Sequence, residues 1–114
     1  MIGPLLWLLL AAAGVLQPPV VTWDGKAPVV ISRPAQPKAG EPIAVAVGRL
    51  PVSARRVEVA ADGLSAPARP AGNGLRRATL FATKAGPLSI VVRFTLRGVR
   101  YESPGAVILV APAS

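Results

Sequence analysis

Apolar residues recur at every second position in several short segments of the chain, a pattern typical of β-strands that bury one face. Residues 43–47 alternate large aliphatic side chains with alanines, which we expect on the outside or beneath a neighbour, and residues 56–60 alternate valines with Arg56 and Glu58. The valines of the second segment are expected to face a core, and its charged residues the solvent. With the other segments bounded by Pro, Gly and Asp-Gly turns, the sequence predicts about seven strands.

The clearest pair of strands lies near the C-terminal end. Residues 88–96 place alternate apolar side chains on one face, and Arg97-Gly98 connects them to residues 99–102, so the sequence predicts a β-hairpin. The register in which apolar residues meet and opposite charges meet pairs Leu96 with Val99, Thr95 with Arg100, Phe94 with Tyr101, and Arg93 with Glu102. Residues 103–105 (Ser-Pro-Gly) then interrupt the pattern, which indicates a bulge or a switch between sheets.

These elements predict an all-β fold, an immunoglobulin-like antiparallel β-sandwich over residues 27–112. Valine-rich runs separated by Pro and Gly fit this class, because β-branched side chains pack well on a pleated surface. Pro28 lies in the first expected strand, residues 27–32, and favours an edge position for this strand, since proline cannot donate a hydrogen bond to a neighbouring strand.

Three segments resemble bacterial extracytoplasmic immunoglobulin-like domains. Residues 37–45 hold a Gly-Glu turn before an alternating strand, residues 82–90 are similar to the loop before the penultimate strand, and residues 96–104 resemble the last hairpin. Within that class, the Gly-x-x-Tyr-x-Ser-Pro run of the hairpin is most similar to the BatD oxygen-tolerance family, whose members carry such domains outside the membrane. The resemblance implies a sandwich fold and an extracytoplasmic location. The chain departs from antibody-type domains in having no cysteine pair.

Residues 1–16 are expected to be a signal peptide or an uncleaved membrane anchor, and residues 17–26 a linker. Residues 5–16 are apolar and uncharged, with the length of a signal-peptide core, and shorter than the roughly 20 residues of a transmembrane helix. Ala11-Ala12-Ala13 offers the small-x-small pattern that a signal peptidase accepts. No Lys or Arg precedes the run, which leaves retention as an anchor open, and a buried core helix is a third interpretation. We expect an extracytoplasmic protein, periplasmic or secreted.

The absence of Cys and His excludes disulfides, thiolate nucleophiles, Cys/His zinc sites and imidazole acid–base catalysis. The acids are few and scattered over turns and faces: Asp24, Glu41, Glu58, Asp62 and Glu102. Carboxylate-pair hydrolysis and calcium binding both need acids that cluster, and no serine has a candidate base in a nucleophile pattern. We therefore expect a protein that is not an enzyme, with no catalytic residue, metal or cofactor.

Thirteen Lys and Arg against five Asp and Glu give a net charge of +8, and such a field attracts anionic surfaces or polymers. Four arginines are expected to share one exposed face of the sandwich, partly neutralised by nearby acids: Arg56, Arg93, Arg97 and Arg100. This basic face is the candidate binding site, for an anionic envelope polymer or for lipid head groups. The alternative is a solvated surface whose arginines reflect a GC-rich genome.

Nucleic acid is not an expected partner, because nucleic-acid modules add exposed aromatic residues for base stacking. In this chain Phe94 and Tyr101 are expected to point inward. Trp23 is expected to cover one end of the core, or to lie at a membrane interface if the leader is retained.

We expect a non-enzymatic, exported immunoglobulin-like domain that acts as a protein-recognition module in the cell envelope, with another envelope protein as its partner. Strand addition at an open edge is one mode of recognition that such folds use. Two alternatives stay open. One is a membrane-anchored accessory subunit of an envelope complex, with membrane contact only through a retained leader, and the other is a binder of an anionic polymer through the basic face.

We predict that the protein purified from its native host begins near Gly14, because the small residues that end the apolar run fit a signal-peptidase site. Intact-mass spectrometry measures the N-terminus directly. A chain that begins at Met1 contradicts cleavage and favours the anchored alternative.

Overall fold

The computed structural model describes residues 19–113 of the chain. The expected leader, residues 1–16, lies outside the described residues. From residue 19 to residue 113 there is no helix long and apolar enough to cross a membrane. This part of the chain consists of strands and the turns between them.

Nine β-strands form within residues 19–113, where the sequence predicted about seven. In chain order they are β1 (Val20–Thr22), β2 (Val29–Arg33), β3 (Pro42–Gly48), β4 (Arg55–Ala61), β5 (Leu64–Pro67), β6 (Arg69–Pro70), β7 (Arg76–Phe81), β8 (Gly86–Leu96) and β9 (Val99–Val110). The difference lies in two short strands, β1 and β6.

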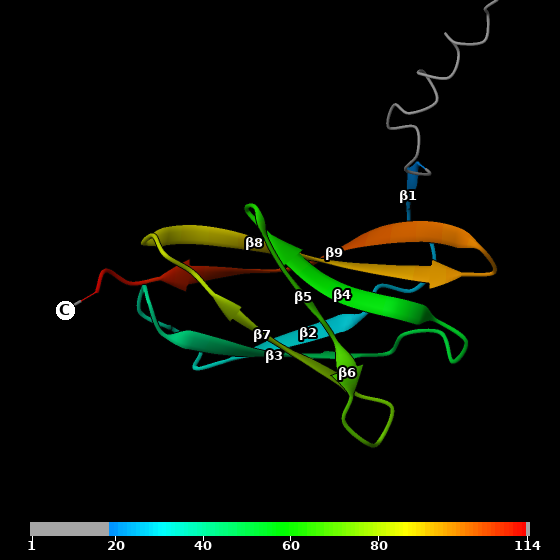
Figure 1. The fold of residues 1–114 in the computed structure, drawn as a ribbon, viewed down its shortest axis with the longest axis horizontal. Helices are drawn as coiled ribbons and strands as arrows, with labels where there is room; N and C mark the ends of the chain where they lie inside the picture. Colours follow the sequence, from blue (N-terminus) through cyan, green and yellow to red (C-terminus); the bar gives the residue numbers. More distant parts are fainter. Residues whose placement is uncertain (1–18, 114) are drawn as a thin grey trace, which may run out of the picture.

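The strands form two sheets that lie face to face (Figure 1). The five-stranded sheet has the order β1-β9-β8-β4-β5, and the four-stranded sheet has the order β2-β3-β7-β6. Neighbouring strands are antiparallel except β1 and β9, which are parallel. The expected all-β sandwich is confirmed, and so is the edge position of β2.

The core between the sheets consists mainly of aliphatic side chains from alternate strand positions. The fully buried members are Ile43, Val45, Val47, Val59, Ile90, Val92, Phe94 and Val110. Burying one such side chain stabilises the fold by about 1.5–3 kcal/mol. The period-two alternation of the sequence therefore decides which face of each strand points inward.

The hairpin of β8 and β9 has the predicted register. All four expected pairs are present: Leu96 with Val99, Thr95 with Arg100, Phe94 with Tyr101, and Arg93 with Glu102. The register is determined locally, because a slip of one residue would turn each inward side chain to the solvent.

Residues 103–105 form a bulge rather than a switch between sheets. The register of β8 against β9 shifts between Ile90 and Val91, where Gly105 is an extra residue on β9. Because one residue is added, the inward positions of β9 change from odd to even numbers, and Ile108 and Val110 face the core. The strand therefore continues without interruption across the bulge.

The switch between sheets occurs instead between β5 and β6. The sequence predicted one short edge strand over residues 64–69, but β5 pairs with β4 and β6 pairs with β7 of the other sheet. The pairing of β5 ends at Pro67, which has no N–H to donate. Ala68 is buried between the two strands, with its backbone N–H bonded to the Val57 carbonyl (2.8 Å).

Strand β1 lies within residues 17–26, the expected linker. Its register pairs Val20 with Arg100 and Thr22 with Glu102. The β-branched side chains of β1 favour extended backbone, but its partner is distant in the sequence. The local pattern therefore did not indicate this strand.

Trp23 follows β1 and covers one end of the core, the first of its two expected positions. Its ring lies edge-on to Phe94 and to Tyr101, with centroid distances of 5.1 and 5.0 Å. Its backbone N–H donates to the Glu102 carbonyl (2.9 Å), and its indole N–H donates to the Lys26 carbonyl (3.0 Å). The three rings form an aromatic cluster in a core that is otherwise aliphatic.

We predict that Trp23→Ala lowers the free energy of unfolding by about 2–4 kcal/mol, because a large, partly buried ring and its two ring contacts are lost. Denaturant unfolding followed by circular dichroism measures the change. Trp23→Phe keeps an aromatic ring at this place and is expected to lose less. Equal stability of the alanine variant and the unchanged protein would contradict the packing role of Trp23.

Candidate functional site

The four arginines of the basic face come from adjacent parts of the five-stranded sheet. Arg56 lies on β4, Arg93 on β8, Arg97 in the turn after β8, and Arg100 on β9. Because β9, β8 and β4 are neighbours in the sheet, Arg56, Arg93 and Arg100 lie on adjacent strands, and Arg97 lies in the turn that joins β8 to β9. In the pairing of β4 with β8, Glu58 lies opposite Arg93.

The Arg100 side chain is held by three acceptors. Its guanidinium donates to the Arg56 carbonyl (2.6 Å), to the Thr95 hydroxyl (3.1 Å) and to a Glu58 carboxylate oxygen (2.7 Å). Only 17% of this side chain is exposed. Since β8 lies between β9 and β4, Arg100 links two strands that do not pair directly.

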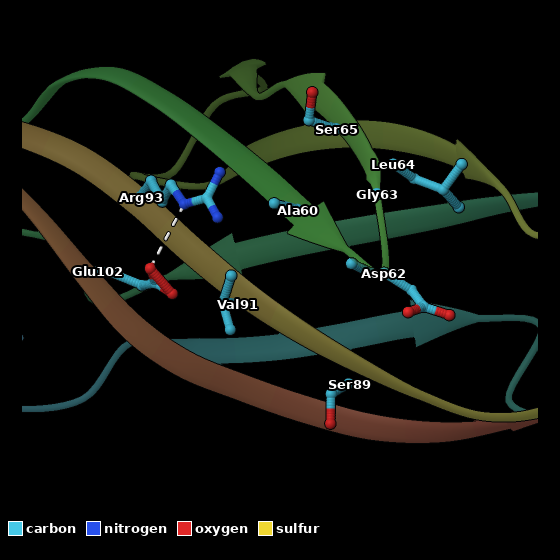
Figure 2. Close-up of a pocket in the computed structure, with 10 residues that line it drawn as sticks. Ala60, Asp62, Gly63, Leu64, Ser65, Ser89, Val91, Arg93 and Glu102 are labelled. Atoms are coloured by element: carbon cyan, nitrogen blue, oxygen red, sulfur yellow. Dashed lines mark ion pairs between the residues drawn. The ribbon is translucent and has the colours of Figure 1, made fainter. Parts of the chain in front are cut away.

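Arg93 is also paired with an acid. Its Nε lies 3.5 Å from Oε1 of Glu102, the residue opposite it in the hairpin, as the dashed line in Figure 2 shows. Both side chains are about one-third exposed. Two of the four arginines therefore have their charge balanced by a neighbouring carboxylate.

Arg56 and Arg97 are exposed, and neither forms an ion pair with an acid of residues 19–113. Both have a left-handed backbone, with φ of 51° and 52°. Arg56 lies where the register of β4 is irregular, and Arg97 lies in the hairpin turn. Two of the four arginines, Arg93 and Arg100, therefore connect strands through ion pairs. Ligand binding by the basic face stays a prediction.

A shallow depression of about 350 Å³ adjoins the Arg93–Glu102 pair on the outside of the five-stranded sheet (Figure 2). Its other polar side chains are Asp62, Ser65 and Ser89, from the β4–β5 turn, β5 and β8. Of its two carboxylates, Glu102 is engaged by Arg93. Among the described residues, no group of three acids that could hold a metal ion is present.

A larger hollow, of about 740 Å³, lies on the outside of the four-stranded sheet. Its floor is the central strand β3, which contributes Ala44, Ala46 and Gly48. Val29 and Ile31 on the edge strand β2 form one wall. Small residues on β3 beside larger ones on its neighbours produce this hollow, the β3 groove.

Three arginines line the β3 groove: Arg33, Arg49 and Arg77. No carboxylate of residues 19–113 forms an ion pair with any of them. The sequence pattern did not indicate this set, because the three arginines are far apart in the chain and come together only when β2 and β7 pair with β3. The signal that was available is the small residue at every second position of β3.

The fold defines the class of protein as an all-β, two-sheet sandwich. The chain matches no family model and no curated protein. Among solved structures it is similar to an endo-beta-1,4-mannanase from Thermotoga petrophila, at 13% identity with a TM-score of 0.49. The match covers 80% of this chain and 21% of the mannanase chain, so this chain spans about a fifth of that protein's length. A likeness at this level supports no argument about function.

We predict that Arg100→Met lowers the free energy of unfolding by about 2 kcal/mol, because Glu58 and the Arg56 carbonyl lose a charged donor. Arg97→Met is the matched control, since Arg97 is exposed and unpaired with any described acid, and it is expected to change stability by less than about 0.5 kcal/mol. Urea unfolding of the two variants measures both values. Similar losses in both would contradict the linking role of Arg100.

Proposed function

We propose that this chain is a non-enzymatic, immunoglobulin-like domain that is exported to the cell envelope and recognises another protein there. The observation that carries this proposal is the outer surface of the four-stranded sheet. An edge strand with exposed apolar side chains lies there beside a groove whose arginines have no acidic partner among the described residues.

The strand order supports the immunoglobulin-like class. In such domains one sheet has the strands A-B-E-D, and the other has G-F-C, with C′ beside C in the variable type. The sheet order β2-β3-β7-β6 fits the first arrangement, and β9-β8-β4-β5 fits the second, with letters assigned in chain order. The parallel bridge between Lys38 and Ala111 adds a contact between the segment after β2 and the end of β9.

The edge strand β2 supports recognition of a protein. Within the described part of the chain β2 pairs only with β3, so the other side of its backbone is open to a further strand. Val29 and Ile31 on its outward face are 39% and 54% exposed. Single exposed apolar residues are common, but two on an open edge beside a groove offer both backbone and side-chain contacts to an added segment.

The envelope location rests on the sequence. The apolar leader, residues 1–16, supports export, and the resemblance of residues 96–104 to the last hairpin of the BatD oxygen-tolerance family supports a place among extracytoplasmic domains. The alternative, a membrane-anchored accessory subunit of an envelope complex, requires that the leader is retained and not cleaved. A polymer binder that uses the basic face has less support, because Arg93 and Arg100 are paired with acids.

Site-specific photo-crosslinking in intact cells of the native host tests this function. A photoreactive amino acid in place of Ile31 is expected to crosslink the domain to one discrete envelope protein, because this position lies on the open edge. Val52 is the control, since it is fully exposed in the loop between β3 and β4 and is not among the residues that line the β3 groove.

A third position, Val107, reports on the outside of the five-stranded sheet, where it is 69% exposed. A discrete protein captured from Ile31 and not from Val52 supports recognition by the four-stranded sheet. Capture from Val107 alone moves the interface to the other sheet. Absence of a protein adduct from all three positions overturns the proposed function.

A further inference from the structure

We propose that the β3 groove binds an extended, acidic segment of the partner protein, whose alternate apolar side chains rest on the alanine floor. This inference rests on the proposed recognition function and specifies the chemistry of what is recognised. Three features of the groove support it: its floor, the placement of its arginines, and the absence of acids among the residues that line it.

Residue size determines the floor. Ala44 and Ala46 lie on the central strand, and Ile31 is opposite Ala46 on β2, so a methyl group lies beside a much larger side chain. Leu75 limits the groove beside Gly48, where a Cβ would come within 3.1 Å of Leu75 Cδ2. The surface is therefore a channel with an apolar base instead of a flat sheet.

The strand register determines where the arginines lie. Arg33 on β2 is opposite Ala44, and Arg77 on β7 is opposite Ala46. The two cations are thus on opposite sides of β3, offset by two residues, or about 7 Å along the strand and about 10 Å across it. Same-side residues of an extended chain also repeat every 7 Å or so.

An alternating segment matches both features. Every second side chain of an extended ligand can face the floor, and the flexible acidic side chains between them can bend sideways toward the arginines on both sides of β3. A uniformly charged polymer would place charges over the apolar floor and lose their hydration. A wholly apolar segment would partly desolvate three arginines without giving them a partner.

The groove also differs from the basic face in its available charge. On the basic face Glu58 and Glu102 balance Arg100 and Arg93. None of the residues that line the β3 groove is acidic. Its volume of about 740 Å³ falls within the usual range of ligand sites, which suits a short peptide segment.

Three capped octapeptides test the proposal by fluorescence anisotropy with the purified protein. The probe alternates Glu and Leu, a second peptide alternates Lys and Leu, and a third alternates Glu and Ser. We expect the Glu-Leu peptide to bind and the Lys-Leu peptide not to bind. The Glu-Ser peptide is expected to bind about ten-fold more weakly, because its side chains bury less apolar surface on the floor.

Variants of the groove locate the site. The double variant Arg33→Glu with Arg77→Glu is expected to weaken binding of the Glu-Leu peptide at least about 25-fold, since each exposed ion pair contributes about five-fold. Ala46→Leu fills the floor and is expected to weaken it about ten-fold without any change of charge. Lys26→Glu with Lys84→Glu makes the same change in net charge outside the groove and is expected to leave affinity within about two-fold. Circular dichroism confirms that each variant is folded.

Each other outcome overturns the inference. Equal binding of the Glu-Ser and Glu-Leu peptides, or an equal loss in the lysine variant, means that net charge alone attracts the peptide. Loss of binding in Arg56→Glu with Arg97→Glu, and not in the groove variants, places the site on the basic face. Failure of the Glu-Leu peptide to bind rejects the ligand class, while crosslinking from Ile31 reports separately on the recognition function.

Discussion

The packing of the two sheets depends on how the inward-facing positions of β8 and β9 are aligned with each other. These are the longest pair of strands in the described chain. Apolar side chains must face the core on both sides of the bulge, and the extra residue at Gly105 makes this possible. Glycine is required there by space, because a Cβ would lie 2.8 Å from Val30 Cγ2 and 2.9 Å from the Ile90 carbonyl oxygen. The bulge therefore sets the strand phase and also permits close approach of β2 from the other sheet.

Arginine has two different roles on the two outer faces. On the five-stranded sheet, Arg100 and Arg93 join strands through Glu58 and Glu102, so charge contributes to the integrity of the sheet. On the four-stranded sheet, Arg33 and Arg77 have no acidic partner among residues 19–113, so their charge is available to a ligand. Net charge alone could not distinguish these roles, which depend on where five acids lie.

The sequence predicted what local pattern determines. The hairpin register followed from the pairing of apolar with apolar and of Arg93 with Glu102, and the inward valines of β3 and β4 followed from alternation. It did not predict β1, because the partner of β1 is about 80 residues away in the chain. It did not predict the division of residues 64–70 either, because that division arises only when β4 and β7, the neighbours of β5 and β6, join different sheets. The β3 groove was not predicted either, because Arg33 and Arg77 come to lie on the two sides of β3 only after β2 and β7 pair with it.

The parallel pairing of β1 with β9 has a mechanical consequence. These strands lie close to the two ends of the described chain and run in the same direction. Tension applied between the two ends would pull β1 and β9 along their length in opposite senses, so that their hydrogen bonds are loaded in shear, all at once. A domain tethered at one end and bound at the other would then resist extension through this pair of strands before the sandwich itself opened.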